Sequence, residues 1–333
     1  MNLKRTLTGI FLFILIGEGM LRFDEYFKVF QENRVVKAIT NIAITPEYTM
    51  LKENKFPLDS NCFRLMVLGD SYISGAGLET KDNFYHQIKS LLQKNNKKFN
   101  SVFVFDASVP KNNNLDNNKT YFEYVDKFKP DIIFFGYNYN DVMDNLQKKA
   151  EIKTGSIAVE NTRASFQEEK SLIKKTVIFI LQSKFARYLH TNLYSQFKAH
   201  GIIFPNSDFD IMMRSYSENQ ERWITSKELL QEWLDDTKKR NIKTIVMQCP
   251  QTDLMAYPYL FVHSDTAIRQ FFTATSSVTY KNIRDYFKDD PKEYILSKYD
   301  GHSNAKAHKK IAEEVYALIQ AETCTKEGFN KPE

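Results

Sequence analysis

The sequence predicts an α/β fold, a doubly wound parallel sheet with helices on both faces. Short apolar runs rich in Val, Ile and Phe alternate with stretches of helical periodicity, and turn residues bound each run. Such runs are typical of buried parallel strands, and their alternation with helices favours right-handed crossovers. The predicted strands are Arg64–Gly69, Val102–Asp106, Asp131–Gly136 and Ile242–Gln248, with a weaker fifth strand near Ser277–Ile283.

Helices are expected between these strands and at the end of the chain. Apolar residues recur at helical spacing over Asn83–Gln93, over Lys119–Phe128 and over the long segment Glu218–Arg240. The stretch 304–320 has the pattern of a closing amphipathic helix, with its apolar residues on one face. The Asn-rich stretch 111–119, with sequence KNNNLDNNK, is expected to be ordinary solvated surface.

The domain organisation follows from the same pattern. About a hundred residues separate the strand ending at Gly136 from the one starting at Ile242, which is far longer than an ordinary crossover. We therefore expect a helical insertion at about 146–220, which is a candidate lid over the sheet. The expected order is a membrane anchor at 1–23, a stalk at 24–61, the α/β domain at 62–322 with its insertion, and a tail at 323–333.

Composition excludes several classes of protein. The 333 residues are 42% hydrophobic and 26% charged with a mean hydropathy of −0.46, which excludes a multi-span membrane protein. The net charge is +5, but no Arg-rich stripe with interleaved aromatic residues is present, so we expect no nucleic-acid partner. The three cysteines show no metal-ligand spacing, so no zinc site is expected.

The N-terminus indicates attachment to a membrane. Lys4 and Arg5 precede an apolar run from Leu7 to Ile16, and neither a small-residue cleavage site nor a lipidation cysteine follows. We favour an uncleaved signal-anchor with its basic end in the cytoplasm, which would place the domain on the periplasmic or extracellular face. An amphipathic or buried N-terminal helix is the alternative, since the run is short for a membrane span.

Polar residues follow the strands at their carboxyl ends, where open α/β sheets bind ligands. The first strand ends in Gly69-Asp70-Ser71, the second leads into DASVPKNNN, the third into GYNYND, and YDGHSN precedes the closing helix. A serine at such a corner is either part of an ordinary strand-to-helix turn or a nucleophile. The convergence of Ser, Asn, Asp and His on one edge of the sheet favours the nucleophile.

A serine hydroxyl needs a positioned base to become a nucleophile. His302 lies in a polar loop two residues after Asp300, so both can face the sheet edge, and Asp300 would orient the imidazole. The backbone N–H of Ser71, the Asn140 amide and a backbone N–H from the 108–112 loop are candidate oxyanion donors. Asp70 and Asp141 are expected to fix the turns beside the site through backbone N–H groups.

These blocks resemble those of the SGNH hydrolases, the GDSL esterase/lipase family, between about Phe63 and Ile319 without the insertion. GDSYISGAGL resembles the block whose serine is the nucleophile, and GYNYND resembles Gly-x-Asn-Asp, which maps Asn140 onto the oxyanion asparagine. DGHSNAKAH resembles the last block and maps Asp300 and His302 onto the catalytic acid and base. The resemblance, including GEGMLRF at the end of the anchor, is to membrane-anchored bacterial members. It implies a flavodoxin-like three-layer fold, ester hydrolysis and no cofactor.

Two positions depart from the family pattern. Lys111 stands where the second block has a glycine whose backbone N–H serves the oxyanion hole, and Asn138 stands where the third block usually has glycine. Both departures bear on the geometry of the oxyanion hole. The same residues would also serve a polysaccharide O-acetyltransferase, and the departures allow a non-catalytic binding or assembly protein on a degenerate scaffold. The main hypothesis is a serine esterase that acts on acylated substrates, with an O-acetylated glycan as the expected partner.

Overall fold

The computed structural model describes residues 45–143, 208–249 and 258–324 apart from short gaps (54, 58–60, 96–97, 288–289 and 298–299), together with isolated positions 13, 16, 17, 202 and 255. Almost all of the predicted anchor, most of the predicted insertion and the tail from 325 lie outside these residues, so they stay predictions. Among the described residues, no helix has the length and apolar character needed to cross a bilayer.

A five-stranded parallel sheet forms the centre of the domain, in the order β2-β1-β3-β4-β5, which confirms the predicted fold class. This is the flavodoxin-like order, in which the chain runs outward from β1 in one direction and then in the other. Every residue of the central strands β1 and β3 is buried, as their apolar runs predicted. The strands are β1 (Cys62–Gly69), β2 (Ser101–Asp106), β3 (Ile132–Tyr137), β4 (Lys243–Gln248) and β5 (Val278–Asn282).

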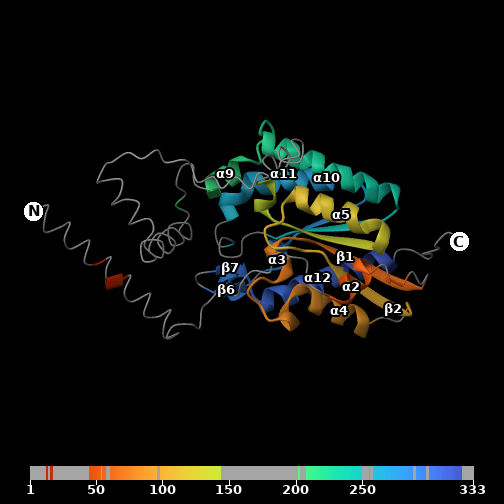
Figure 1. Ribbon diagram of the computed structural model, residues 1–333. Coiled ribbons are helices and arrows are strands. Elements are labelled where there is room, and N and C mark those ends of the chain that lie inside the picture. Colours follow the sequence, from red (N-terminus) through yellow and green to blue (C-terminus); the bar gives the residue numbers. More distant parts are fainter. Residues whose placement is uncertain are drawn as a thin grey trace, which may run out of the picture. The chain divides into compact units, whose positions relative to one another are not determined.

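Helices cover both faces of the sheet (Figure 1). One layer consists of α5 (Asn114–Phe128), α10 (Glu221–Lys239) and α11 (Val262–Thr273), and the other of α4 (Phe84–Lys94) and α12 (Ala305–Cys324). The first layer packs on a core rich in aromatic residues that includes both tryptophans, Trp223 and Trp233. The sequence patterns predicted four of these five helices, and α11 was missed.

Shorter elements complete the described part of the chain. A two-stranded antiparallel hairpin, β6 (Ile295–Ser297) and β7 (Asp300–Ser303), stands where the sequence predicted a loop before the closing helix. The short α-helices are α2 (Pro46–Lys52), α3 (Ser71–Ser74) and α9 (Asp208–Arg214). The 3₁₀ turns are η2 (Thr80–Asp82), η3 (Tyr139–Val142), η5 (Pro258–Phe261), η6 (Ile283–Asp285) and η7 (Pro291–Tyr294).

The ordered domain includes part of the predicted stalk. Helix α2 lies inside the range 24–61, yet its Leu51 is buried in the core against the first helical layer. Its Glu47 is also buried, and accepts hydrogen bonds from the Tyr85 hydroxyl at 2.9 Å and from the Lys89 ammonium at 2.7 Å. Because these contacts join α2 to α4, the domain begins at least as early as Thr45.

The Asn-rich stretch is not the solvated surface that its composition predicted. Asn113, Asn114 and Asn117 are at most 3% exposed, and α5 begins at Asn114 instead of Lys119. The Asn113 side chain accepts the backbone N–H groups of Leu115 and Asp116, and the Asp116 carboxylate accepts the N–H of Asn113 in return. This capping box gives the stretch a structural role that composition alone could not indicate.

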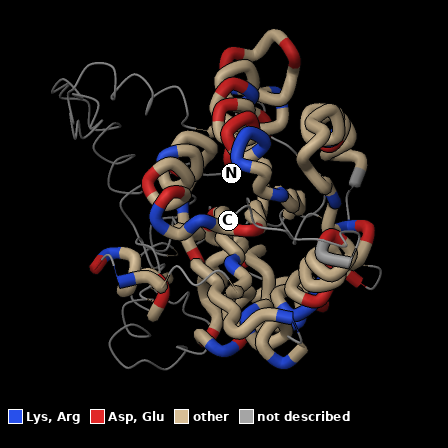
Figure 2. The backbone as a smooth tube through the Cα atoms, turned by 90° about the vertical axis from the view of Figure 1, so that its right-hand side faces the viewer, with Lys and Arg blue, Asp and Glu red and all other residues tan. Residues whose placement is uncertain are grey.

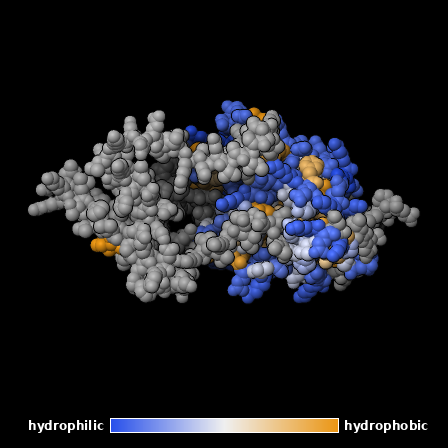
Figure 3. All heavy atoms as spheres, viewed as in Figure 1, coloured by the Kyte–Doolittle hydropathy of each residue, from blue (hydrophilic) through white to orange (hydrophobic). Residues whose placement is uncertain are grey.

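The described surface carries charges of both signs and is largely hydrophilic on the sides that the figures present. Figure 2 shows Lys and Arg interspersed with Asp and Glu along the helices on the side it presents. In Figure 3 the described part of the visible face is largely hydrophilic, with only small, separate hydrophobic spots.

The buried histidine His308 joins α12 to the start of α4. His308 is 1% exposed, and its Nδ1 accepts the backbone N–H of Phe84 at 2.9 Å, so the residue packs inside the protein and caps the start of α4. Burial, reinforced by the nearby charge of His302, lowers the pKa of His308 to about 3. The unfolded chain therefore takes up a proton at His308 that the folded protein does not.

We predict that His308→Asn flattens the acid side of the stability profile. The stabilisation that depends on a neutral His308 is fully present above the ordinary histidine pKa of 6.5 and is lost as pH falls toward about 3. This group alone should lower the free energy of unfolding by about 2 kcal/mol between pH 7 and pH 5. Asparagine keeps an acceptor for Phe84 but does not titrate. Urea unfolding at the two pH values measures the difference, and an unchanged pH dependence in the variant would contradict this role.

Candidate active site

The turn after β1 presents Ser71 at the carboxyl edge of the sheet. Asp70 caps the four-residue helix α3, with its carboxylate accepting the Tyr72 backbone N–H at 3.0 Å. This is the turn-fixing contact expected of Asp70. Gly75 ends the helix with a φ of 78°, a left-handed conformation that glycine adopts without steric cost. Ser71 thus occupies the first position of a helical turn held at both ends.

A pair of glycines makes room for this turn. Gly69 in β1 lies opposite Gly136 in β3, and Ile73 of α3 packs directly over both. A Cβ added to Gly136 would lie 2.1 Å from Cγ1 of Ile73, far inside van der Waals contact. The two strands therefore need a residue without a side chain at this level if α3 is to lie on them.

The structure brings His302 and Asp300 to Ser71. The Nε2 atom of His302 lies 2.9 Å from the Ser71 Oγ, and its Nδ1 lies 2.5 Å from Oδ1 of Asp300. The same Asp300 oxygen accepts the His302 backbone N–H at 3.0 Å, so the carboxylate holds both the ring and the chain that carries it. Both residues belong to β7, and the hairpin sets their direction.

The surroundings fix the state of these groups. Although half-burial alone would raise it, the pKa of Asp300 is lowered by hydrogen bonds from the ring and backbone of His302. Asp300 is therefore a carboxylate at neutral pH and favours the His302 tautomer that carries its proton on Nδ1. The His302 ring also stacks on Tyr72, with ring centroids 4.7 Å apart. Tyr72 is a contact that the sequence analysis missed, although it directly follows Ser71.

Asn140 is tied to the same turn from the neighbouring strand. Its Nδ2 donates to Oδ2 of Asp70 at 3.1 Å, while the other Asp70 oxygen binds Tyr72. An amide nitrogen carries two protons, so one donor of Asn140 remains for a ligand. Asp70 is thus more than the turn residue expected from the sequence, because it also fixes the side chain of Asn140.

The conformation of Asn138 shows why this position need not be the glycine that is usual in the third sequence block. It has an extended backbone, with φ −117°, so this position does not require glycine. Its side chain accepts the Tyr139 N–H at 2.7 Å, and the Asp141 carboxylate accepts the Asn138 N–H at 2.9 Å. Asn138 and Asp141 therefore cap the η3 turn, which is the loop-fixing role expected of Asp141.

Lys111 adopts the backbone conformation that glycine would take. Its φ is 71°, one of three positive values at non-glycine residues in the described part of the chain. The loop is held beside the turn that carries Ser71 because the Val109 N–H donates to the Gly69 carbonyl at 3.2 Å. The Lys111 side chain is exposed to solvent. The loop keeps a glycine-like course despite the substitution.

Two buried carboxyl groups lie beneath the site. Asp70 and Asp141 are both 0% exposed. Burial raises the pKa of each carboxyl group, and the neighbouring Asp70 raises the pKa of Asp141 further.

The asparagine Asn117 also supports the site, since its Oδ1 accepts the backbone N–H of Gly69 at 3.2 Å. Among the described residues, no group of His, Cys, Asp and Glu has the arrangement needed to hold a metal ion.

Comparison with known proteins adds likeness of fold alone. No family model matches the chain, and the search of curated proteins finds no match. The structure is similar to the esterase EstA from Pseudoalteromonas sp., at 11% identity over 78% of this chain and 98% of that one, with a TM-score of 0.44. A Clostridium thermocellum family 3 carbohydrate esterase is similar at 13% identity over 79% and 98%, with a TM-score of 0.44. The acetyl xylan esterase AlAXEase follows at 14% identity over 77% and 100%, with a TM-score of 0.43.

Likenesses this distant carry no conclusion about activity. The function of the site therefore has to be argued from its own residues.

We predict that Gly136→Ala destabilises the protein and displaces the turn Ser71–Ser74. The new methyl group would overlap Ile73, and overpacking of this kind costs roughly 1–3 kcal/mol. Urea unfolding measures the loss, and Ile73→Ala in the same chain should offset part of it, because it removes the overlapping atoms. Strictly additive losses in the double variant would contradict direct contact between the two positions.

Proposed function

We propose that the protein is a serine esterase in which Ser71 attacks an ester carbonyl and forms an acyl-enzyme. The observation that carries the proposal is the hydrogen-bonded chain from Ser71 through His302 to Asp300, at 2.9 Å and 2.5 Å. A neutral imidazole in this position accepts the serine proton on Nε2 as the new C–O bond forms. Asp300 stabilises the resulting imidazolium through Nδ1–H.

The negative charge that develops on the carbonyl oxygen needs preorganised donors. We assign this role to the Asn140 amide and to the backbone N–H groups of Ser71 and Lys111. Neither backbone group donates a hydrogen bond within the described part of the chain, as expected of donors reserved for a ligand. The left-handed course at Lys111 supports its inclusion, since the peptide group follows the path that glycine would give it.

When the tetrahedral intermediate collapses, His302 passes its proton to the leaving alcohol, which completes the first half of the reaction. In the second half, water attacks the acyl carbonyl while His302 takes a proton from it. His302 then returns this proton to the Ser71 Oγ as the acyl-enzyme bond breaks, which releases the carboxylic acid and restores Ser71. These steps use only protein groups and water.

The expected substrate is an ester-linked acyl group, with O-acetyl groups on a glycan as the specific candidate. This choice rests on the resemblance of the three sequence blocks and on the predicted export of the domain.

The proposal predicts that active-site reagents label Ser71. A fluorophosphonate probe should react with the full-length protein, and Ser71→Ala and His302→Ala should abolish both labelling and p-nitrophenyl acetate hydrolysis. Asn140→Ala should lower kcat roughly 10²–10³-fold, the usual loss for one oxyanion donor. Ser74→Ala is the matched control, because it removes a hydroxyl from the same helix. The Oγ of Ser74 lies 3.5 Å from the backbone carbonyl oxygen of Ser71. This control should keep full activity.

Two results would overturn the proposal. Undiminished labelling of Ser71→Ala would mean that another residue is the nucleophile. Folded parent protein that neither reacts with the probe nor hydrolyses p-nitrophenyl acetate would favour a non-catalytic scaffold.

A further inference from the structure

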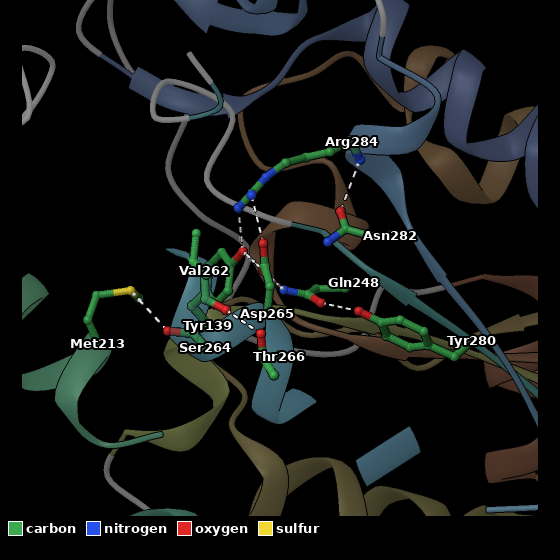
Figure 4. Close-up of polar contacts among 10 residues, drawn as sticks. All are labelled: Tyr139, Met213, Gln248, Val262, Ser264, Asp265, Thr266, Tyr280, Asn282 and Arg284. Atoms are coloured by element: carbon green, nitrogen blue, oxygen red, sulfur yellow. Dashed lines mark hydrogen bonds and ion pairs between the residues drawn. The ribbon is translucent and has the colours of Figure 1, made fainter. Parts of the chain in front are cut away.

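A second polar cluster lies at the carboxyl ends of β3, β4 and β5 (Figure 4), and its Tyr139 directly precedes Asn140 in the chain. Its central members are Tyr139, Asp265 and Arg284, which come from η3, α11 and η6. Gln248 of β4 and Tyr280 of β5 extend it. The sequence analysis gave none of these residues a role, since they are far apart in the chain.

The three central side chains form a closed set of contacts. The Tyr139 hydroxyl donates to the Asp265 carboxylate and accepts from the Arg284 guanidinium at 2.5 Å. Arg284 also binds the second Asp265 oxygen at 2.7 Å, and Gln248 donates to the first at 2.6 Å. Burial raises the pKa of Tyr139 well above its ordinary value, so the hydroxyl keeps the proton that it donates.

The ring of Tyr139 is held as firmly as its hydroxyl. It is 0% exposed and stacks on Phe261 with centroids 4.6 Å apart, and Arg284 lies over the same Phe261 ring. The Tyr139 carbonyl accepts the hydroxyl of Tyr216 at 2.8 Å. Both the side chain and the backbone of Tyr139 are therefore fixed by residues from other elements.

Tyr139 directly precedes Asn140 in the η3 turn. We propose that Tyr139, Asp265 and Arg284 are positioning residues that fix this turn, so that the Asn140 amide meets the oxyanion at hydrogen-bond distance. The inference rests on the proposed esterase function and adds residues to it that do not touch the reacting atoms. The contacts of Tyr139 hold the backbone of the η3 turn, whereas Asp70 holds the Asn140 side-chain amide itself through a hydrogen bond.

The charges of the cluster favour a positioning role over simple packing. The side chains of Arg284 and Asp265 are only 15% and 19% exposed, and taking an ion pair out of water is costly unless its geometry is well satisfied. Apolar residues would fill such space at least as stably, but they would not define one orientation of a tyrosine hydroxyl. An oxyanion donor has to be held in one orientation, because small displacements of a catalytic group lower the rate steeply.

Tyr139→Phe tests the proposal with little risk to the fold. It keeps the stacked ring and the Arg284–Asp265 ion pair and removes only the shared hydroxyl. We expect kcat for p-nitrophenyl acetate to fall roughly tenfold or more with KM nearly unchanged, because the oxyanion forms only in the transition state. In an Asn140→Ala background the same change should cost nothing further, since the residue being positioned is gone.

The matched control is Tyr121→Phe, which removes another buried tyrosine hydroxyl bonded to a carboxylate. Tyr121 donates to Asp236 at 2.6 Å between α5 and α10, outside the cluster and the site. Its kcat should equal that of the parent. An unchanged kcat in Tyr139→Phe, or the same fold-loss with and without Asn140, would overturn the proposal.

A readout without catalysis separates this proposal from the esterase proposal. The side-chain amide signals of Asn140 can be followed in full-length protein labelled with ¹⁵N-asparagine and assigned by their loss in Asn140→Ala. Arg284→Lys, far from Asn140 in sequence, should shift them, and Tyr121→Phe should not. Unmoved signals would overturn the positioning role even in an active enzyme, whereas a parent without turnover would overturn the esterase function alone.

Discussion

The close packing of Ile73 on a pair of facing glycines is the constraint on which the site depends. Gly69 and Gly136 meet in register between β1 and β3, and no side chain separates the strands from α3 at that level. The turn can therefore lie directly on the sheet at the point where its strand order reverses, which is where open α/β sheets bind their ligands. Ser71 lies at the start of this helix, where its Oγ meets Nε2 of His302.

From that turn, hydrogen bonds spread outward in one connected set. Asp70 links the turn that carries Ser71 to Asn140, and the η3 caps link Asn140 to Asn138 and Asp141. Tyr139 then links η3 to Asp265 and Arg284. Residues in or just after β1, β3, β4 and β5 belong to this set, since Gln248 of β4 bonds to Asp265 and Tyr280 of β5 bonds to Gln248. The departures at Lys111 and Asn138 are compatible with it, because one keeps a glycine-like backbone and the other caps a turn.

Local signals were enough to predict the sheet and the residues at its edge. Buried parallel strands are continuous apolar runs, so β1 to β4 could be placed within two residues, and the polar residues Ser71 and Asn140 come two and three positions after the ends of β1 and β3. What failed depends on tertiary contact. Asn117 looks like a surface residue until its side-chain oxygen Oδ1 accepts the Gly69 N–H. Arg284 binds Tyr139, which is 145 residues away in the chain, and Asp265, which belongs to α11. The hairpin β6–β7 is too short for periodicity to reveal.

We expect Ser71 to carry the acyl group between the two halves of the reaction. Acid quenching of full-length protein during p-nitrophenyl acetate turnover, followed by peptide mass spectrometry, tests this directly. An acetyl group should be found on the Ser71 hydroxyl, with none at Ser74 in the same peptide. Acetylation of another residue in place of Ser71, or turnover without any acetylated intermediate under conditions where deacylation is limiting, would contradict it.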